Sequence, residues 1–142
     1  MKILVSACLL GLPCRYDGAS KPHAGTLSLL EKHTLTPFCP ECMGGLPTPR
    51  TPSERVGERV LSQDGTDVTE QYRRGAAMAL QLAELYGCEA ALLKERSPSC
   101  GCGTVYDGSF TGTLFSGNGV AAELLLQNGI AVYGESDWQK LL

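Results

Sequence analysis

Seven cysteines make thiols the most prominent source of chemistry in this chain of 142 residues. An odd number of cysteines, in a sequence without a recognisable secretion signal, argues against a complete disulfide framework and favours metal binding or thiol chemistry. Cys88 follows a helical pattern and is expected to be structural. The other six lie beside turns that contain glycine or proline: Cys8, Cys14, Cys39, Cys42, Cys100 and Cys102.

Spacing alone points to a zinc site. Cys39-x-x-Cys42 and Cys100-x-Cys102 have the short paired spacings of four-thiolate zinc, although such a site leaves the two N-terminal cysteines unused. The "CPEC" pair taken alone also has the spacing of a redox dithiol. A redox dithiol normally opens a helix, and glycines and prolines follow this pair almost at once, so the sequence argues against a redox dithiol.

A different grouping follows from the predicted strands. The apolar runs "KILVSA", "TLTPF" and "CEAALLK" precede the loops that hold Cys8, Cys39 and Cys100. The carboxyl ends of parallel strands meet at one edge of a sheet, where α/β proteins bind their ligands. One cysteine from each loop then gives the alternative to zinc, an iron-sulfur cluster held by these three thiols.

Strands alternate with helices along the chain. Helical spacing of apolar residues predicts helices over residues 24–33, 70–87 and 120–127. A last strand is expected over residues 130–135 and a last helical turn over residues 136–142. This alternation predicts an α/β fold, with a mostly parallel sheet and helices on both of its faces.

The middle of the chain gives two more detailed expectations. A hairpin is predicted with its turn at Asp64 and Gly65, and Thr66 or Asp67 is expected to cap the helix that follows. The apolar face of that helix is predicted from spacing to contain Ala77, Leu80, Ala83 and Leu85.

Length and charge exclude several classes of protein. A chain of this length is expected to form one domain, residues 1–142. Twelve basic against 15 acidic residues give no overall signature of a nucleic-acid-binding protein. The N-terminal apolar run is far shorter than the roughly 18 residues that span a membrane, and we interpret it as a buried strand of a cytoplasmic protein.

The segment "SGNGVAA" imitates a dinucleotide-binding fingerprint, with Gly117, Gly119 and Ala122 at the right offsets and Glu135 after the next strand. Such a fingerprint normally opens a long βαβ arrangement, and here little more than one strand follows. A helix entered through a glycine turn explains the segment better.

Three longer motifs resemble a known family. "VSACLLGLPCRYDG", "FCPECMGGLPTPR" and "LLKERSPSCG" occur in this order, and "DGTDVTEQYRRGA" and "GNGVAAELLLQNGIAVYGE" fit the same general pattern. Together they resemble the thiouracil desulfidase family over nearly the whole chain. Each motif is short, but their shared order and spacing make chance similarity a poor explanation.

The resemblance implies a Rossmann-like domain that holds a 4Fe-4S cluster by only three cysteines. Carried over motif by motif, the implied ligands are Cys8, Cys39 and Cys100. The fourth iron is then open to the sulfur of a thiolated base, and a thiophilic Lewis acid of this kind can polarise a C=S bond. The implied reaction replaces the sulfur of 2- or 4-thiouracil or of a thiouridine by oxygen from water and releases sulfide.

Such an attack by water needs a base. Glu41 lies two residues after Cys39 and is the carboxylate best placed by sequence for that role, although a loop glutamate can also be merely solvated. Ser97 is expected to hydrogen-bond the water or the substrate. Ser99 is expected at the substrate or in the turn that presents Cys100, and the roles of the two serines are interchangeable at this stage.

The loop "CRYDG" is expected to form another wall of the site. Tyr16 could pack on a pyrimidine ring and Asp17 could accept a hydrogen bond from its N–H, unless Asp17 is only a turn residue. Lys94 could supply positive charge beside an anionic cluster, or lie on the surface as an ordinary lysine. Arg15 and Arg50 leave the same choice open.

Two further thiols depart from the family pattern, Cys42 in place of an apolar residue and Cys102 beside the third implied ligand. If either of them bound the open iron, the result would be a four-cysteine cluster that carries electrons or stabilises the fold. A structural zinc or four-cysteine protein is therefore the alternative to the enzyme. The acidic charge favours a small thiolated pyrimidine as substrate, with thiolated tRNA second.

Overall fold

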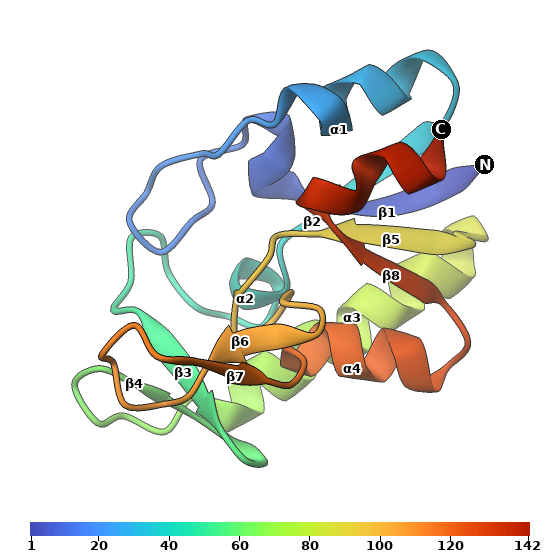
Figure 1. Ribbon diagram of the computed structural model, residues 1–142. Helices are drawn as coiled ribbons and strands as arrows, with labels where there is room; N and C mark the ends of the chain where they lie inside the picture. Colours follow the sequence, from blue (N-terminus) through green and yellow to red (C-terminus); the bar gives the residue numbers. More distant parts are fainter.

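A four-stranded parallel sheet forms the centre of the computed structural model, which describes all residues from 1 to 142 (Figure 1). Its strands are β1 (Lys2–Ser6), β2 (Thr34–Phe38), β5 (Ala90–Leu93) and β8 (Ala131–Gly134), in the order β2-β1-β5-β8. Every neighbouring pair is parallel. The expected parallel sheet is confirmed.

The two central strands are apolar because both faces of the sheet are covered. Ile3, Leu4 and Val5 of β1 have no exposed surface, and every residue of β5 is buried. Strands that are buried on both faces show continuous apolar runs in the sequence and no alternation with polar residues. This explains why "ILV" and "AALL" mark the middle of the sheet.

Helices cover both faces of the sheet, as predicted (Figure 1). On one face, α3 and α4 pack over an apolar cluster that includes Leu4 and Leu93. On the other face, α1 and the 3-10 helices pack over a cluster that includes Val5 and Leu92. The bounds are α1 (Ala24–Ser28), α2 (Pro40–Met43), α3 (Thr69–Tyr86), α4 (Val120–Gln127), η1 (Ala7–Leu10), η2 (Leu29–Glu31) and η3 (Glu135–Leu141).

The buried face of α3 differs from the expected one. Ala83 is buried, but Ala77 is exposed and Leu85 keeps 72% of its surface in solvent. The short helix α2 packs so closely on α3 that a Cβ atom at Gly75 would lie 1.8 Å from the Pro40 carbonyl oxygen. A stripe of small residues, with Tyr72 before it, therefore faces inward, while the predicted Leu80 is only partly buried against the core. The buried residues are Tyr72, Gly75, Ala76, Ala79 and Ala83.

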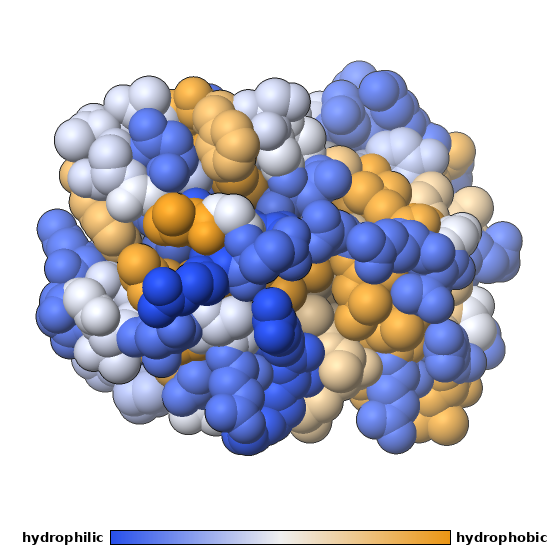
Figure 2. All heavy atoms as spheres, turned by 90° about the horizontal axis from the view of Figure 1, so that it is seen from below, coloured by the Kyte–Doolittle hydropathy of each residue, from blue (hydrophilic) through white to orange (hydrophobic).

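Several leucines and other apolar residues lie on the surface of the protein. Figure 2 views the molecule from below and shows apolar residues lying between hydrophilic ones on that face. Leu126 of α4, for example, keeps 40% of its surface exposed.

Two antiparallel hairpins lie outside the sheet and next to each other (Figure 1). The first consists of β3 (Ser53–Val56) and β4 (Arg59–Ser62), and the second of β6 (Thr104–Tyr106) and β7 (Leu114–Ser116). The first pairs Val56 with Arg59. Both hairpins project toward the site described below.

The first hairpin turns at Gly57 and Glu58, so the predicted turn at Asp64 and Gly65 was wrong for this hairpin. Gly57 has a φ of 60°, which suits a two-residue hairpin turn. Asp64 and Gly65 form a second turn that leads back alongside β4. The N-cap of α3 is Val68 and not Thr66 or Asp67 as expected, although Asp67 accepts a hydrogen bond from the first N–H of α3 at 2.9 Å.

The chain changes direction across the sheet at β1. From β1 it passes to β2 on one side, and it later returns to β5 on the other side of β1. At such a switch point the loops after the two strands diverge and leave a crevice at the carboxyl edge, which is the usual place for a ligand in an open α/β sheet. No helix in the structure has the length and apolar character needed to cross a membrane.

Candidate active site

A pocket of about 500 Å³ lies at this carboxyl edge. Cys8, Cys39 and Cys100 all line it, from the loops after β1, β2 and β5. The far wall comes from the two hairpins and includes Ser53 and Tyr106. The predicted convergence of the three cysteine loops is thus seen in the structure.

Cys8 lies on the single 3-10 turn η1 that follows β1 directly. Its carbonyl oxygen accepts hydrogen bonds from the N–H groups of Gly11 and Lys21, at 3.2 and 2.9 Å. Gly11 closes the turn with a φ of 97°, a conformation that favours glycine. These bonds fix the backbone around Cys8, which is only 7% exposed.

Cys39 is the residue immediately before α2, with Pro40 in the first helical position. Proline suits this position because the missing N–H would have no partner there. The prediction that "CPEC" does not open a helix was therefore wrong. The glycines that follow end α2 after one turn but do not prevent the helix from forming. Gly44 allows α3 to pack closely, because a Cβ at this position would lie 2.0 Å from the Gln71 carbonyl oxygen.

Cys100 lies in a turn that is stabilised by hydrogen bonds with its own serine and with the start of α4. The Ser97 hydroxyl oxygen accepts hydrogen bonds from the N–H groups of Ser99 and Cys100, at 3.2 and 3.1 Å. The carbonyl oxygens of Pro98 and Ser99 accept the first N–H groups of α4, at 2.9 to 3.1 Å. A Cβ at Gly119 would lie 2.4 Å from the Ser99 carbonyl carbon, so this contact requires glycine.

The same contacts exclude the dinucleotide interpretation of "SGNGVAA". A dinucleotide site needs free N–H groups at the start of the helix for the phosphates. In α4 these groups are occupied by the carbonyl oxygens of the cysteine turn. Glu135 is occupied too, because it forms an ion pair with Lys94 at 2.9 Å and accepts the N–H of Glu95 at 2.6 Å.

Two of the three thiols, Cys39 and Cys100, lie in surroundings that keep them protonated when no metal is bound. Burial raises the pKa of Cys100 to about 12, although hydrogen bonds with the Ser6 and Ser99 hydroxyls oppose the change. The hydrogen bond with Cys14, and then burial, raise the pKa of Cys39 above its usual range. A metal that binds these sulfurs must displace their protons.

A fourth thiol, Cys14, also lines the pocket and was given no role from the sequence. Its sulfur is hydrogen-bonded to both Cys8 and Cys39. The bond with Cys39 lowers the pKa of Cys14, but the bond with Cys8 and burial outweigh it and raise the pKa to about 11. The loop "CRYDG" that begins with Cys14 was expected in the wall of the site, but the sequence assigned no contact to the thiol itself.

Glu41 has its carboxylate fixed from two sides. Its side chain is 13% exposed and forms an ion pair with Arg50, with 3.0 Å between Nε and Oε1. The other oxygen, Oε2, accepts a hydrogen bond from the Ser99 hydroxyl at 2.9 Å and lies 3.5 Å from the Ser97 hydroxyl. Glu41 is therefore part of the pocket wall and is not a solvated loop charge.

Arg50 links three parts of the site. Besides Glu41, its guanidinium donates to the carbonyl oxygens of Cys14 at 2.9 Å and Pro47 at 3.2 Å, and to the Thr48 hydroxyl at 3.1 Å. Its side chain is only 6% exposed. Arg50 is therefore not an ordinary surface residue. It connects Glu41, the candidate general base, to the loop that carries Cys14.

Two buried hydroxyls were missed by sequence reasoning. Ser6, at the end of β1, is 3% exposed, accepts the N–H of Lys94 at 2.9 Å and hydrogen-bonds the Cys100 thiol. Tyr72 of α3 is 1% exposed and its hydroxyl hydrogen-bonds Glu41 and Ser53. Burial and the Glu41 carboxylate raise the pKa of Tyr72, which keeps its hydroxyl protonated.

The structure separates the two serines of "SPSCG" by burial. Ser99 is 1% exposed, and its hydroxyl is directed to Glu41. Ser97 is partly exposed, and its oxygen holds the turn. Both line the pocket, but only 1% of the surface of Ser99 is exposed.

Of the other predicted binding residues, Tyr16 and Lys94 line the pocket and Asp17 does not. Tyr16 is 42% exposed at its rim, with the Arg15 guanidinium 5.7 Å from the centre of its ring. Asp17 is exposed and accepts the N–H of Ala19 at 3.0 Å, so it acts as a turn residue and not as part of the pocket wall. The Lys94 ammonium is engaged by Glu135.

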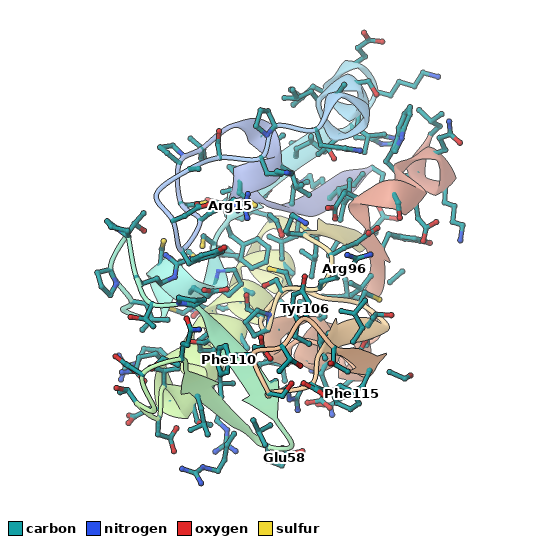
Figure 3. All side chains as sticks on the ribbon, turned by 60° about the vertical axis from the view of Figure 1, so that its left-hand side comes forward. Arg15, Glu58, Arg96, Tyr106, Phe110 and Phe115 are labelled. Atoms are coloured by element: carbon teal, nitrogen blue, oxygen red, sulfur yellow. The ribbon has the colours of Figure 1, made fainter.

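The rim contains Arg15, whose role the sequence left open, and three residues that the sequence did not indicate. Arg15, Arg96, Tyr106 and Phe110 come from separate loops and strands and all line the pocket (Figure 3). Arg96 and Phe110 have φ values of 67° and 57°, a strained conformation for residues other than glycine. Such strain is concentrated at functional sites. No local sequence pattern predicts these positions, which come from separate segments of the chain.

Cys42 and Cys102 do not line the pocket. The Cys42 sulfur lies 3.3 Å from the Thr48 hydroxyl, and the Cys102 sulfur lies 3.6 Å from the Val132 carbonyl oxygen. The four cysteines of the zinc hypothesis are therefore not gathered around one point. No group of three His, Cys, Asp or Glu side chains is close enough to hold a single metal ion.

The donor set of the pocket nevertheless fits an iron-sulfur cluster. Thiolates are the ligands of these clusters, and each cysteine binds a different iron, so the sulfurs need not meet at one point as around zinc. Three thiols from three separate loops, each fixed by its own backbone contacts, meet this requirement. The fold and the site define an α/β protein with a thiol-lined pocket at the carboxyl edge of a parallel sheet.

The chain belongs to the 2-thiouracil desulfurase family, whose pattern it matches over residues 3–137. This confirms the resemblance found in the sequence. It is 39% identical to the uncharacterized protein YbbK of Bacillus subtilis, over 99% of each chain. It is 48% identical to the 4Fe-4S-dependent thiouracil desulfidase TudS, whose solved structure it matches with a TM-score of 0.89 over 99% of this chain and 94% of that one.

Proposed function

We propose that this protein is a 4Fe-4S-dependent desulfidase that removes sulfur from thiolated pyrimidines such as thiouracil. The observation that carries the proposal is the meeting of three cysteine loops and the Glu41 carboxylate in one pocket at the switch point of the sheet. The family and the similarity to TudS support it.

Cys8, Cys39 and Cys100 are the residues that would hold the cluster, because they are the thiols that the three strand loops bring to the pocket. The cluster, when bound, supplies an iron without a protein ligand, a thiophilic Lewis acid for the sulfur of the substrate. The buried hydroxyl of Ser6 supports this arrangement by hydrogen-bonding Cys100.

Glu41 is the general base. It accepts a proton from a water molecule that attacks the thiocarbonyl carbon, and it returns that proton to the departing sulfur. The C=S bond is replaced by C=O, and water and the thiocarbonyl compound become the carbonyl compound and hydrogen sulfide, with no change in oxidation state. Arg50 and Ser99 hold the carboxylate in place during both transfers.

Ser97 is the hydroxyl that contacts the water or the substrate. Its oxygen accepts two N–H groups, and its proton lies within reach of the Ser99 hydroxyl at 3.0 Å and the Glu41 carboxylate at 3.5 Å, so a ligand would take this hydrogen bond over from them. Ser99 positions Glu41. This division keeps the role expected for Ser97 and removes Ser99 from substrate binding, because Ser99 is almost completely buried.

The substrate is a small thiolated pyrimidine, held between the cysteine loops and the aromatic rim. Tyr16, Tyr106 and Phe110 offer ring faces for stacking. The charge of Lys94 is balanced by its ion pair with Glu135, so we assign Lys94 to the pocket wall and not to direct substrate binding. The net charge of −3 disfavours tRNA as the main substrate.

Sulfide release from 2-thiouracil, 4-thiouracil, thiouridine and thiolated tRNA tests the proposal with protein purified without oxygen. The Glu41→Gln variant should keep the brown colour of the cluster and lose about 10²- to 10⁴-fold in the rate of sulfide release, the usual contribution of general base catalysis. Glu58→Gln is the matched control, because that carboxylate is 82% exposed and lies outside the pocket.

Two results would contradict the proposal. Wild-type protein that carries a cluster but releases no sulfide from any of the four substrates is not a desulfidase of this class. Unchanged turnover in Glu41→Gln would remove Glu41 from the role of base and leave the overall reaction standing.

A further inference from the structure

Cys42 is a thiol that the proposed reaction does not use, and it lies beside a cysteine that the reaction needs. We propose that Cys39 and Cys42 form a redox-active dithiol, which reacts with low-molecular-weight disulfides when the cluster is absent. The inference rests on the proposed function only in taking Cys39 as a cluster ligand.

The two sulfurs converge on one atom. The Cys39 sulfur lies 3.8 Å and the Cys42 sulfur 3.7 Å from the carbonyl oxygen of Cys14. Cys39 precedes α2 and Cys42 is the third residue within it, a separation at which side chains on one helical turn meet. A disulfide between them needs little backbone movement.

The two thiols differ in access, which gives them different roles. Cys42 is outside the pocket and partly exposed, with the Arg50 guanidinium 3.7 Å from its sulfur. Cys39 lines the pocket. A small disulfide therefore reaches Cys42 first, and Cys39 is the resolving thiol. Cys14, whose carbonyl oxygen the Cys39 sulfur approaches at 3.8 Å, is the competing thiol, and the experiment below separates the two pairings.

The exchange balances without any other reactant. The Cys42 sulfur attacks one sulfur of oxidised glutathione or a similar disulfide, and one reduced glutathione leaves. The Cys39 sulfur then attacks the Cys42 sulfur of the mixed disulfide and releases the second glutathione. Two protein thiols are oxidised, one small disulfide is reduced, and the two protons pass to the released thiols.

The disulfide withdraws one of the three cluster ligands. Cluster-free protein in the disulfide form cannot take up the cluster until the pair is reduced. The disulfide also protects Cys39 from irreversible oxidation, because a disulfide is reversible where the higher oxidation states of sulfur are not. In the loaded protein Cys39 is engaged by iron, and the pair does not form.

Mass spectrometry of the full-length, cluster-free protein tests the pairing after treatment with oxidised glutathione. Trypsin releases residues 33–50, with Cys39 and Cys42, and residues 3–15, with Cys8 and Cys14, as separate peptides. The first peptide should be lighter by two hydrogen atoms and resist alkylation until it is reduced. Full alkylation of that peptide, or a cross-link between the two peptides, would overturn the proposal.

Variants extend the test. Cys42→Ser should lose the internal disulfide of residues 33–50, whereas Cys102→Ser, the matched control, should form the disulfide like the wild type. Circular dichroism verifies that both variants are folded. A Cys102→Ser variant without the disulfide would contradict the assignment.

Reconstitution with iron and sulfide tests the consequence. Oxidised wild-type protein should remain colourless without a thiol reductant and become brown after one is added; a full yield of cluster without reductant would refute the block on loading. The Cys39→Ser variant separates this inference from the proposed function. If that variant still binds the cluster, the ligand assignment fails while the disulfide stands.

Discussion

The substitution of Arg50 by methionine gives the sharpest test of how Glu41 is held. Methionine keeps most of the volume of arginine and removes its charge and its donors. Glu41 then remains in the pocket wall at 13% exposure without its cation. Ser99 still donates to it at 2.9 Å, so the carboxylate loses one of its fixed sides and not both.

The expected loss of stability follows from these contacts. Removing one partner of a buried ion pair costs about 3–5 kcal/mol, because the remaining charge is left uncompensated. The pair here is buried on both sides, with exposures of 6% for Arg50 and 13% for Glu41, so little solvent screening reduces that figure. The double variant Glu41→Gln/Arg50→Met removes the stranded charge and should recover about 1–3 kcal/mol, the usual size of coupling between contacting residues.

Urea unfolding followed by circular dichroism measures the four free energies of this cycle, and sulfide release measures activity in the same proteins. Arg50→Met should lower turnover because Glu41 loses its orientation. Arg55→Met is the matched control, since Arg55 is also buried and paired with a glutamate, Glu123, but lies outside the pocket. It should lower stability and leave turnover per folded molecule unchanged.

Additivity would refute the reasoning. If the double variant is less stable than the wild type by the sum of the two single losses, Arg50 does not compensate the charge of Glu41. Equal loss of turnover in Arg50→Met and Arg55→Met would show that destabilisation alone, and not the position of Glu41, lowers activity.

Three further outcomes are expected. Gly119→Ala should destabilise the protein by about 1–3 kcal/mol in thermal melts, because the new Cβ would lie 2.4 Å from a backbone carbon of the cysteine turn, and an unchanged melting curve would contradict that contact. Cys100→Ser should abolish the visible absorbance of the cluster while Cys102→Ser retains it; the reverse would overturn the ligand assignment. Burial raises the pKa of Glu95, but hydrogen bonds from Ser136 outweigh it and the net pKa is lowered, so the carboxylate stabilises the fold at neutral pH and loses that effect as the pH falls through its folded pKa. Glu95→Gln should therefore be less stable than the wild type at pH 7 in urea unfolding, with a difference that shrinks in acid; a constant difference would contradict the ionised contact.

The position of the three cysteine loops was predictable because it follows from topology. Parallel strands end at the same edge, and any loop that follows such a strand starts there. Cys8 and Cys39 come within two residues of the ends of β1 and β2, so their place needed no knowledge of side-chain packing. Helix α4 was predicted with its observed bounds for a similar reason, since a glycine turn and Asn128 mark its two ends.

The contacts that make the site specific were not predictable in the same way. Arg50 meets the Cys14 carbonyl across 36 residues of chain, and Ser99 meets Glu41 across 58. No local pattern encodes such pairs. The roles of Ser97 and Ser99 depend on which way each side chain leaves the turn, and that direction is set by the backbone around Pro98.

The error on α3 has a packing cause. Helical spacing selects the larger residues as the buried face, but α2 approaches at Gly75 and leaves room only for small side chains. The buried face of α3 is thus set by α2, a one-turn helix that the sequence did not predict.

The two hairpins outside the sheet divide the protein into parts that can change independently. The thiols and Glu41 come from loops tied to the sheet and to α4, while Ser53, Tyr106 and Phe110 come from the hairpins and their connection. A hairpin can be exchanged, lengthened or recombined without moving a strand of the sheet. Diversification of this scaffold toward bulkier thiolated molecules therefore requires new hairpins and no new catalytic centre.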